Sequence, residues 1–430
     1  MSHETIAILL LLGLFAGLMI IRVPIALSVG ISSALTTLYL GIPVQMVLQN
    51  MVKGINTFSL MAVPFFILMG EIMSAGGISD RLVKLANALV GWMHGGLAMV
   101  NIVASMFFGA VSGSAAADCA TLGPVLIPIM KEQGYDEEFA TGITLSSSVE
   151  GLLIPPSHNL VIYSLAAGSI SVGALFMAGL VPGIFLGVCL MIYSYIVSIK
   201  RHYPVGDKFR VQALWKAFCE AFWGLLTIVI VVIGVCTGFI TATESAALAV
   251  IWSFVVTFGI YRDVPIKKAP EMFLKAVKTL AMVMILIATS TAFGWLLTYL
   301  KVPEILAGGI RHISENPVII MLIINVMLLV MGMIMDMSSI ILIVTPILLP
   351  IVTSLGYDPV HFGVIMVLNL GIGLLTPPVG SVLFIGSAVS GIKLEKLAVS
   401  MIPFYIVMIA CLLLVTFIPA ISMTLPGLVM

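Results

Sequence analysis

Apolar segments of about twenty residues follow one another through the whole chain, and this pattern restricts the fold more than any single motif does. The uninterrupted segments lie at about 5–21, 24–42, 58–75, 173–198, 217–238, 243–261, 280–300 and 397–421. A helix needs about 20 apolar residues to cross roughly 30 Å of hydrocarbon. Only 9% of the residues are charged, against about 25% in soluble proteins. We therefore predict an all-α, polytopic membrane protein, since a membrane barrel would show short alternating strands instead.

Two longer apolar runs are interrupted at their centres by small and polar residues. The run at about 97–130 contains Ser-Gly-Ser-Ala-Ala-Ala-Asp at 112–118, and the run at about 318–352 contains Met-Asp-Met-Ser-Ser at 335–339. Each interruption leaves two arms that are too short to cross the hydrocarbon separately. We predict two re-entrant helical hairpins with polar tips.

A double proline interrupts the apolar segment that follows each hairpin. Pro155 and Pro156 lie within the segment at about 139–168, and Pro377 and Pro378 lie within the segment at about 361–390. Proline lacks a backbone donor and disfavours helix in the residue before it, so two in succession unwind a helix. Each segment is predicted to be a broken helix.

The two interrupted regions repeat each other at a separation of 222 residues. The matching residues are Pro124, Pro128, Gly134, Tyr135, Asp136, Pro155 and Pro156, which correspond to Pro346, Pro350, Gly356, Tyr357, Asp358, Pro377 and Pro378. Matches that include Gly-Tyr-Asp and Pro-Pro at one offset indicate an internal duplication. The predicted halves are residues 1–199 and 217–430, joined by a cytoplasmic linker at 200–216.

Lysine and arginine in the loops predict the orientation, because they are enriched on the cytoplasmic side. The linker at 200–216 and the loop at 262–278 carry five each, and counting spans outward from them places 16 of the 19 inside. This count gives about ten crossings and brings the two hairpins in from opposite sides. The halves are therefore predicted to be inverted repeats, which are typical of secondary transporters with sites near the midplane.

The tips and breaks are the predicted binding positions, because unwound backbone at membrane depth needs a partner. Neutral oxygen ligands suit a small hard cation such as sodium. The predicted sodium-binding residues are Ser112, Gly113, Ser114, Gly151, Pro155, Gly332, Asp336, Ser338, Gly371, Gly373, Thr376 and Pro377. A half-helix amino terminus can hold an anion. The predicted substrate-binding residues are Ser146, Ser147, Ser148, Glu150, Ser157, His158, Asn369, Gly380 and Ser381.

Each candidate also has a structural interpretation. Small residues such as serine and glycine fill transmembrane helix interfaces simply to allow close packing. Intramembrane acids are functional candidates by default, although Asp118 would also serve as the cap of a hairpin arm. For Glu150, a proton-carrying or water-facing role and a buried hydrogen-bonded acid are both open. His158 either bonds a substrate oxygen or lines a helix, and Glu244 has capping-box spacing with Thr241.

The sequence carries no enzyme signature. It has no Walker loop, no metal-ligand histidine pair at helical spacing and no large aqueous domain. We therefore expect no enzymatic activity and no cofactor, with transport driven by an ion gradient or by another chain. Nineteen basic and nineteen acidic residues cancel, which leaves no basic field for nucleic acid. The five cysteines have no CxxC spacing and are interpreted as packing residues.

Several motifs in order along the chain resemble the large membrane subunit of tripartite ATP-independent periplasmic (TRAP) transporters. They include Ser-Gly-Ser-Ala-Ala-Ala-Asp at 112–118, Ile-Pro-Pro-Ser at 154–157, Gly-Phe-Ile-Thr-Ala-Thr-Glu-Ser at 238–245 and Gly-Ile-Gly-Leu-Leu-Thr-Pro-Pro-Val-Gly at 371–380. The resemblance covers essentially the whole chain. It implies sodium-coupled uptake of an organic acid (a C4-dicarboxylate, sugar acid or sialic acid) by an elevator mechanism in a bacterial inner membrane. The implied partners are a small four-helix membrane subunit, a periplasmic substrate-binding protein and the surrounding lipid.

Carried onto this sequence, the resemblance implies that residues 112–114, 151–156, 336–338 and 371–377 line the sodium and substrate sites. Glu150, His158 and Asn159 are more polar than the family's usual residues, and an ionised Glu150 would repel a dicarboxylate. Two other functions remain open. One is a stand-alone cation-coupled anion carrier that needs no binding protein, and the other is an ion channel, which paired hairpins favour less.

Overall fold

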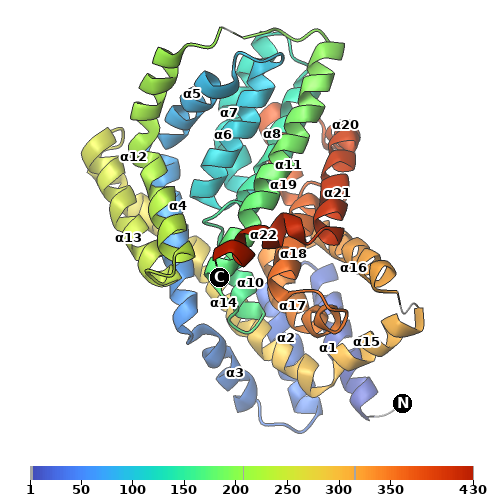
Figure 1. The fold of residues 1–430 in the computed structure, drawn as a ribbon. Coiled ribbons are helices and arrows are strands. Elements are labelled where there is room, and N and C mark those ends of the chain that lie inside the picture. Colours follow the sequence, from blue (N-terminus) through green and yellow to red (C-terminus); the bar gives the residue numbers. More distant parts are fainter. Residues whose placement is uncertain (1–2, 207, 314–315, 430) are drawn as a thin grey trace.

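The computed structural model describes residues 3–206, 208–313 and 316–429, and over these ranges the chain is built from helices (Figure 1). The described residues form no β-strand and only one isolated bridge, between His94 and Val205. Helices are expected from the composition, because in hydrocarbon each backbone N–H and C=O must be bonded within its own segment. The predicted all-α, polytopic membrane fold is confirmed.

By length and apolar composition, six helical stretches of the described chain can cross a membrane. They are α1 (His3–Ile20), α11 (Val172–Lys200), α12 (Val211–Cys236), α13 (Ala242–Phe254) with its continuation η2 (Val255–Tyr261), η3 (Ile266–Lys268) with α14 (Ala269–Tyr299), and α17 (Met337–Ser354). Two bent pairs raise the number to eight: α4 (Ala62–Ala75) with α5 (Ile78–Val90), and α20 (Leu394–Ser400) with α21 (Ile402–Phe417). The total of about ten crossings stays a prediction.

The remaining helices are shorter, and several form the interrupted regions. Hairpin 1 consists of α6 (Gly96–Ser112) and α7 (Ala115–Glu132), and hairpin 2 of α16 (Pro317–Gly332) and α17. The prediction that every arm is too short to cross is wrong for α17, which alone is long and apolar enough, and the re-entrant course of both hairpins stays a prediction. The first broken helix comprises α8 (Glu137–Ser148), α9 (Glu150–Leu153) and α10 (His158–Ala166), and the second comprises α18 (Pro359–Gly373) and α19 (Ser381–Ser390). The others are α2 (Ile25–Tyr39), α3 (Gln45–Ile55), η1 (Phe58–Met61), α15 (Val302–Ile313) and α22 (Ala420–Val429).

Four unwound stretches separate these helices, and each double proline lies in one of them. The first tip is residues 112–114, which begins with the last residue of α6, and the second tip is residues 333–336. Each hairpin turns at its tip. The first break is residues 154–157 and the second break is residues 374–380. Proline cannot donate a helical hydrogen bond, so the ladder ends before each pair.

The sequence repeat coincides with a repeat of helices. Helices α7 and α17 begin and end 222 residues apart, and α8 and α18 begin 222 residues apart. The turns before α8 and α18 match as well, because Gly134 and Gly356 both have a φ of +87°. The opposite insertion of the two hairpins remains a prediction.

The two halves pack reciprocally. Helix α19 of the second broken helix packs against α7 of hairpin 1, and α10 of the first broken helix packs against α17 of hairpin 2. In Figure 1, α12 and α13 lie on one side of the molecule and α15 and α16 on the other. The unwound stretches of both halves therefore lie within one packed body of helices.

The capping box predicted at the start of α13 is present. The backbone N–H of Thr241 donates to the Glu244 carboxylate at 2.8 Å, and the N–H of Glu244 donates to the Thr241 hydroxyl at 3.3 Å. The two residues satisfy each other's free donors. The structural interpretation of Glu244 is confirmed.

Candidate functional site

The first tip reverses the chain between α6 and α7. Gly113 has a φ of +62°, a left-handed conformation that favours glycine. The Ser114 hydroxyl accepts a hydrogen bond from the N–H of Ala117 at 3.3 Å and thereby caps α7. Ser112 and Ser114 are both partly exposed. The tip therefore offers oxygen atoms that a ligand can reach.

The first tip lies directly against the first break. A Cβ atom on Gly113 would lie 3.2 Å from the carbonyl oxygen of Pro156 and 3.1 Å from Nδ1 of His158. Ser157 caps α10, and its hydroxyl also donates to the carbonyl oxygen of Leu152 at 2.6 Å. His158 is partly exposed beside the tip. Two interruptions that are about forty residues apart in sequence thus form one surface.

The three predicted serines before the first break are buried. Ser146 and Ser148 donate to backbone carbonyls of their own helix at 2.8 and 2.7 Å. Such bonds satisfy a hydroxyl locally and leave it little reason to bind a ligand. Ser147 also donates within its helix, to the carbonyl oxygen of Thr144 at 3.2 Å, and in addition its hydroxyl lies 2.9 Å from that of Ser105 on α6. The role of all three serines in substrate binding stays a prediction.

A polar seam of buried side chains joins α6 to α7, α8 and α9. Its members are Asn101, Ser105, Asp118, Thr144, Ser147 and Glu150. The Asn101 amide donates to the Thr144 hydroxyl at 2.6 Å, and the next contact along α6 is the one between Ser105 and Ser147. Sequence reasoning missed Asn101, Ser105 and Thr144, because single polar residues in apolar helices give no signal of what they face.

Two carboxyl groups lie in this seam without partners. Asp118 is 1% exposed and Glu150 is 0% exposed, and none of their carboxyl oxygens has a hydrogen-bond partner in the described residues. The Ser105 hydroxyl faces Asp118 without the geometry of a hydrogen bond, and the two acids are close enough to interact electrostatically. The cap of α7 is Ser114, so the capping interpretation of Asp118 is wrong. Glu150 is buried but is not a hydrogen-bonded acid.

The second tip is hydrogen-bonded to the second break. The backbone N–H groups of Val379 and Gly380 donate to the carbonyl oxygen of Met333 at 3.1 and 3.3 Å. Asp336 caps α17, where its carboxylate accepts from the N–H of Ser338 at 3.0 Å. Unlike Asp118, Asp336 is exposed. The contact between tip and break therefore recurs in the second half. There the aspartate Asp336 caps a helix, whereas Asp118 in the first half is buried without a partner.

Backbone carbonyls gather within the second break. A Cβ atom on Gly380 would lie 2.9 Å from the carbonyl oxygen of Thr376 and 3.3 Å from that of Leu374. The Tyr405 hydroxyl donates to the carbonyl oxygen of Leu375 at 2.6 Å. That carbonyl already has a donor, whereas no side chain in the described residues donates to the carbonyl oxygen of Thr376. Sequence reasoning missed Tyr405 as well.

Asn369 lies one turn before the second break and belongs to a buried amide pair. Its side-chain nitrogen donates to the carbonyl and side-chain oxygens of Asn325 at 2.9 and 2.8 Å. Its own side-chain oxygen has no partner in the described residues. Asn369 therefore orients α18 against α16, and its free oxygen is an acceptor that remains available.

Glycine contacts bring each hairpin onto its broken helix. A Cβ atom on Gly109 would overlap the Cα atom of Gly151, and a Cβ atom on Gly373 would lie 2.7 Å from the Cα atom of Gly332. Real Cβ atoms do not approach that closely, so only glycine fits at these crossings. The packing explains Gly151, Gly332 and Gly373 without a ligand, and their predicted roles in sodium binding stay predictions.

One further contact joins the two breaks. A Cβ atom on Gly371 would lie 2.8 Å from Cγ1 of Val149 and 2.9 Å from Cδ1 of Leu152. The residues that precede the second break therefore pack against the residues that precede the first. Together with the two contacts between tip and break, this places all four interruptions in one continuous cluster, which we call the interruption cluster.

The predicted site residues divide by accessibility within this cluster. Those that are partly or fully exposed are Ser112, Ser114, His158, Asp336, Ser338, Thr376, Pro377 and Ser381. Those that are buried are Gly113, Ser146, Ser147, Ser148, Glu150, Gly151, Pro155, Ser157, Gly332, Asn369, Gly371, Gly373 and Gly380. The exposed residues come from both tips and from both breaks or the helix starts that follow them.

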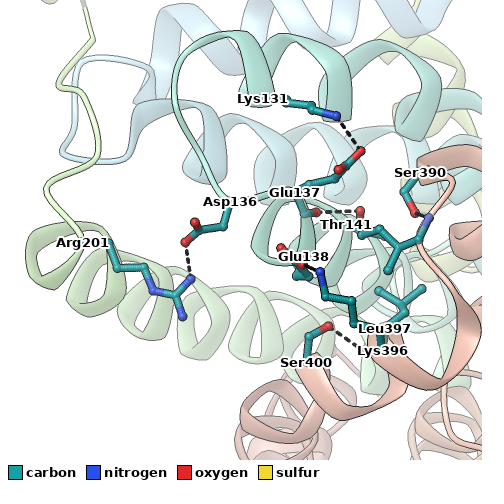
Figure 2. A network of polar contacts seen from close by, with 11 residues as sticks. Lys131, Asp136, Glu137, Glu138, Thr141, Arg201, Ser390, Lys396, Leu397 and Ser400 are labelled. Atoms are coloured by element: carbon teal, nitrogen blue, oxygen red, sulfur yellow. Dashed lines mark hydrogen bonds and ion pairs between the residues drawn. The ribbon is translucent and has the colours of Figure 1, made fainter.

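A polar network stabilises the expected cytoplasmic end of the first broken helix (Figure 2). Asp136 bonds the guanidinium of Arg201 and accepts from the Tyr203 hydroxyl at 2.6 Å. Glu138 pairs with Lys396 of α20. The bonds of Asp136 to Tyr203 and, to a lesser extent, to Arg201 hold the pKa of its carboxyl group below the usual value. The network joins α8 to α11 and α20, away from the interruption cluster.

Comparison with known proteins places this arrangement in a family. The family model described as "Tripartite ATP-independent periplasmic transporter, DctM component" matches residues 12–421. This chain belongs to that family. The match covers both hairpins, both broken helices and the linker between the halves.

Several relatives of this DctM component cover nearly its whole length. The uncharacterized protein YgiK of Salmonella typhimurium is 41% identical over 98% of this chain and 97% of its own. The isethionate TRAP transporter permease protein DctMQ of Oleidesulfovibrio alaskensis is 40% identical over 97% of this chain and 66% of its own. The C4-dicarboxylate TRAP transporter large permease protein DctM of Pseudomonas aeruginosa is 40% identical over 93% of this chain and 94% of its own.

A solved structure shares the fold of this DctM component. The YdaH transporter of Alcanivorax borkumensis superposes with a TM-score of 0.63 over 85% of this chain and 86% of that chain, at 14% identity. The likeness concerns the fold alone. Membership in the DctM family and the apolar helices together make this chain a large permease subunit of the bacterial inner membrane.

Proposed function

We propose that this permease takes up a small organic acid together with sodium, and that the interruption cluster holds both. The observation that carries the proposal is the contact of two tips and two breaks in one cluster, where exposed hydroxyls, free carbonyls and helix starts meet. Family membership supports it, since a DctM component is part of a tripartite transporter. The relatives named for isethionate and C4-dicarboxylates make an organic acid the expected class of substrate.

Sodium would be held by neutral oxygens at the tips and breaks. The accessible oxygens include the hydroxyls of Ser112 and Ser114 at the first tip. At the second break, the carbonyl oxygen of Thr376 lies beside Gly380, whereas that of Leu374 already accepts from the N–H of Val382 at 3.1 Å. Hard cations take several oxygen ligands of this kind, without soft donors. Asp336 would add a full negative charge at the second tip.

The substrate anion would be held without a basic side chain. The segments 85–130, 132–199 and 312–392 contain no lysine or arginine. Helix amino termini supply N–H groups and a favourable dipole instead, and α7, α10, α17 and α19 all begin at the cluster. Ser114, Ser157 and Asp336 cap the first three, whereas α19 has no side-chain cap and offers its first N–H groups to a ligand. His158 and Ser381 are exposed at two of these starts and would bond oxygens of the acid group.

Delivery and movement complete the proposal. A periplasmic binding protein would bring the acid, and a small membrane subunit would support the helices around the moving part. The hairpins and broken helices would move together as an elevator, because glycine contacts bind each hairpin tightly to its broken helix. The inverted relation of the two halves would let the same cluster open to either side in turn.

Reconstituted vesicles test this function. Uptake of labelled isethionate, C4-dicarboxylates, sugar acids and sialic acid would be measured with sodium or with potassium, with and without a small subunit and candidate binding proteins. We expect uptake only with sodium and the complete set of partners, and a reduced sodium affinity in Thr376→Val. Equal uptake in potassium would contradict sodium coupling. Uptake by this chain alone would favour a stand-alone carrier.

Thr424→Val is a matched control for Thr376→Val. Thr424 also donates its hydroxyl to a carbonyl of its own helix, but it lies in α22, outside the interruption cluster. Both variants lose one hydroxyl at nearly constant volume. We expect the sodium affinity of Thr424→Val to match that of the unchanged protein, so that equal losses in both variants would indicate a general defect.

A further inference from the structure

A cavity of about 790 Å³ lies beside the linker between α11 and α12. Its walls come from α5, from both arms of hairpin 1 and from the linker, and they include Lys84, Asn87, Gln133, Tyr135, Lys208 and Arg210. The linker is the segment whose basic residues predict the cytoplasmic side. The cavity therefore opens where a membrane lipid of the cytoplasmic leaflet would carry its headgroup.

The described lining of the cavity is positively charged. Lys84, Lys208 and Arg210 line it, and no acidic residue of the described chain does. Lys84 lies 3.8 Å from Glu220, a partly exposed pair that is worth little. Neither Lys208 nor Arg210 has an ion pair within the described ranges. Asn87 and Gln133 add neutral donors, so the cavity suits an anionic group with several oxygens.

An apolar groove of about 450 Å³ adjoins this cavity. All of its lining residues are apolar, and they include Leu85, Leu89, Phe107, Trp215, Phe218 and Leu225. Cavity and groove share the same two helices at neighbouring positions: on α5 Ala88 lines the cavity and Leu89 the groove, and on α12 Ala213 lines the cavity and Leu214 the groove. The pair therefore has a polar and an apolar compartment side by side.

The dimensions of the groove fit one leaflet. Its lining on α12 runs from Val211 to Leu225, which corresponds to ~21 Å at the helical rise of about 1.5 Å per residue. One leaflet is roughly 20–22 Å thick when its headgroup region is included, of which about 15 Å is hydrocarbon. Trp215 is 67% exposed, so that the groove is open on its outer side.

We propose that an anionic glycerophospholipid binds in these two compartments. Its phosphate and headgroup occupy the cavity against Lys84, Lys208 and Arg210, and an acyl chain follows the groove along Trp215 and Phe218. Basic pockets between helices on the cytoplasmic side recognise lipid headgroups by the same physics. An apolar helix of a partner chain would fill the groove but leave the basic cavity without counter-charge. The proposal depends on the orientation of the chain and is independent of the transported substrate.

A lipid titration of the purified full-length chain tests the proposal. The chain in neutral detergent would receive phosphatidylglycerol or phosphatidylcholine with identical acyl chains, with thermal midpoint and native mass spectrometry as readouts. We expect phosphatidylglycerol to raise the midpoint by several degrees more than phosphatidylcholine does, and to remain bound at lower concentration. The double variant Lys208→Gln/Arg210→Gln should weaken phosphatidylglycerol binding at least tenfold and phosphatidylcholine binding much less, because the choline cation offsets the charge of the phosphate in that lipid.

A matched control removes the same charge elsewhere. Lys267→Gln/Lys268→Gln takes two basic residues from η3, outside both compartments, and should bind phosphatidylglycerol like the unchanged chain. Leu89→Trp fills the groove without touching a charge and should weaken the binding of both lipids. The two lipids are first compared on the unchanged chain, and this comparison does not depend on the folding of any variant.

Four results would overturn the proposal. The first is equal binding of the two lipids by the unchanged chain, and the second is the same loss in both double variants. The third is a full midpoint shift from inorganic phosphate or glycerol 3-phosphate alone, which would make the cavity a site for free anions. The fourth is displacement of phosphatidylglycerol by a co-purified small subunit, which would make the groove a protein interface.

Discussion

Gly109 and Gly151 cross backbone to backbone, and a Cβ atom on either would overlap the other residue's Cα atom. The contact fixes α6 of hairpin 1 on α9, one turn before the first break. Gly332 and Gly373 make the corresponding contact in the second half. Each hairpin is thereby joined to the broken helix with which it would have to move.

Gly151→Ala should destabilise the chain. The added methyl group has no space at the crossing, and overpacking of this kind costs about 1–3 kcal/mol. Gly13→Ala is the matched control, because nothing lies within 4 Å of a Cβ atom at that position in α1. We expect a lower thermal midpoint in detergent for Gly151→Ala than for Gly13→Ala. Equal midpoints would show that the crossing is looser than described.

Tyr405→Phe should destabilise the second break. The variant removes the hydroxyl that donates to the carbonyl oxygen of Leu375, and an unsatisfied buried acceptor costs about 1–3 kcal/mol. We expect a lower thermal midpoint and an altered sodium dependence of uptake, because a carbonyl at the break is released. Tyr299→Phe, at an exposed position of α14, should leave both unchanged. An unaltered sodium dependence in Tyr405→Phe would show that the carbonyl oxygen of Leu375 does not belong to the sodium site.

Local signals in the sequence predicted the architecture well. The double prolines mark breaks and the Thr241–Glu244 spacing marks a helix start, because each involves residues that are neighbours in the chain. The contact between Ser105 and Ser147, or between Tyr405 and Leu375, joins residues that the sequence separates. Which face a lone serine or tyrosine presents depends on how helices pack, and a single sequence does not record that.

The acids show the same limit more sharply. Asp336 is the last residue of the second tip and Asp118 lies four residues after the first tip, inside α7, and both were candidates for function. In the structure Asp336 is an exposed cap, whereas Asp118 is buried without a partner beside Glu150. Their surroundings differ because the helices that cover them come from distant segments. The sequence identified the acids as unusual but could not distinguish the two environments.

Glu150→Gln should stabilise the chain or leave its stability unchanged. The carboxyl group is fully buried and has no hydrogen-bond partner in the described residues, so a neutral side chain of equal size removes a cost and breaks no bond. The exposed Glu132→Gln is the control and should leave the thermal midpoint unchanged. A large drop in the thermal midpoint of Glu150→Gln would reveal a partner for this carboxylate.

Acidification should weaken the network at the expected cytoplasmic end (Figure 2). Tyr203 and Arg201 lower the pKa of Asp136, so its bonds stabilise the folded chain above the ordinary carboxyl pKa of about 4. That contribution is lost as pH falls through the lowered pKa. The difference in thermal midpoint between the unchanged chain and Asp136→Asn should therefore be present at pH 7 and shrink below about pH 4. Asp80→Asn, at an exposed position, should show little difference at either pH.

Residues at the outer ends of the two hairpins test the inverted arrangement directly. Lys131 in the last turn of α7 and Thr353 in the last turn of α17 lie at equivalent positions, 222 residues apart, and both are exposed. If the halves are inverted, Lys131→Cys should react with a membrane-impermeant thiol reagent only from the cytoplasmic side and Thr353→Cys only from the other side. The labelling would be done in a background without the five native cysteines. Equal reactivity from one side would mean that both hairpins enter together, and alternating access of one shared cluster would lose its structural basis.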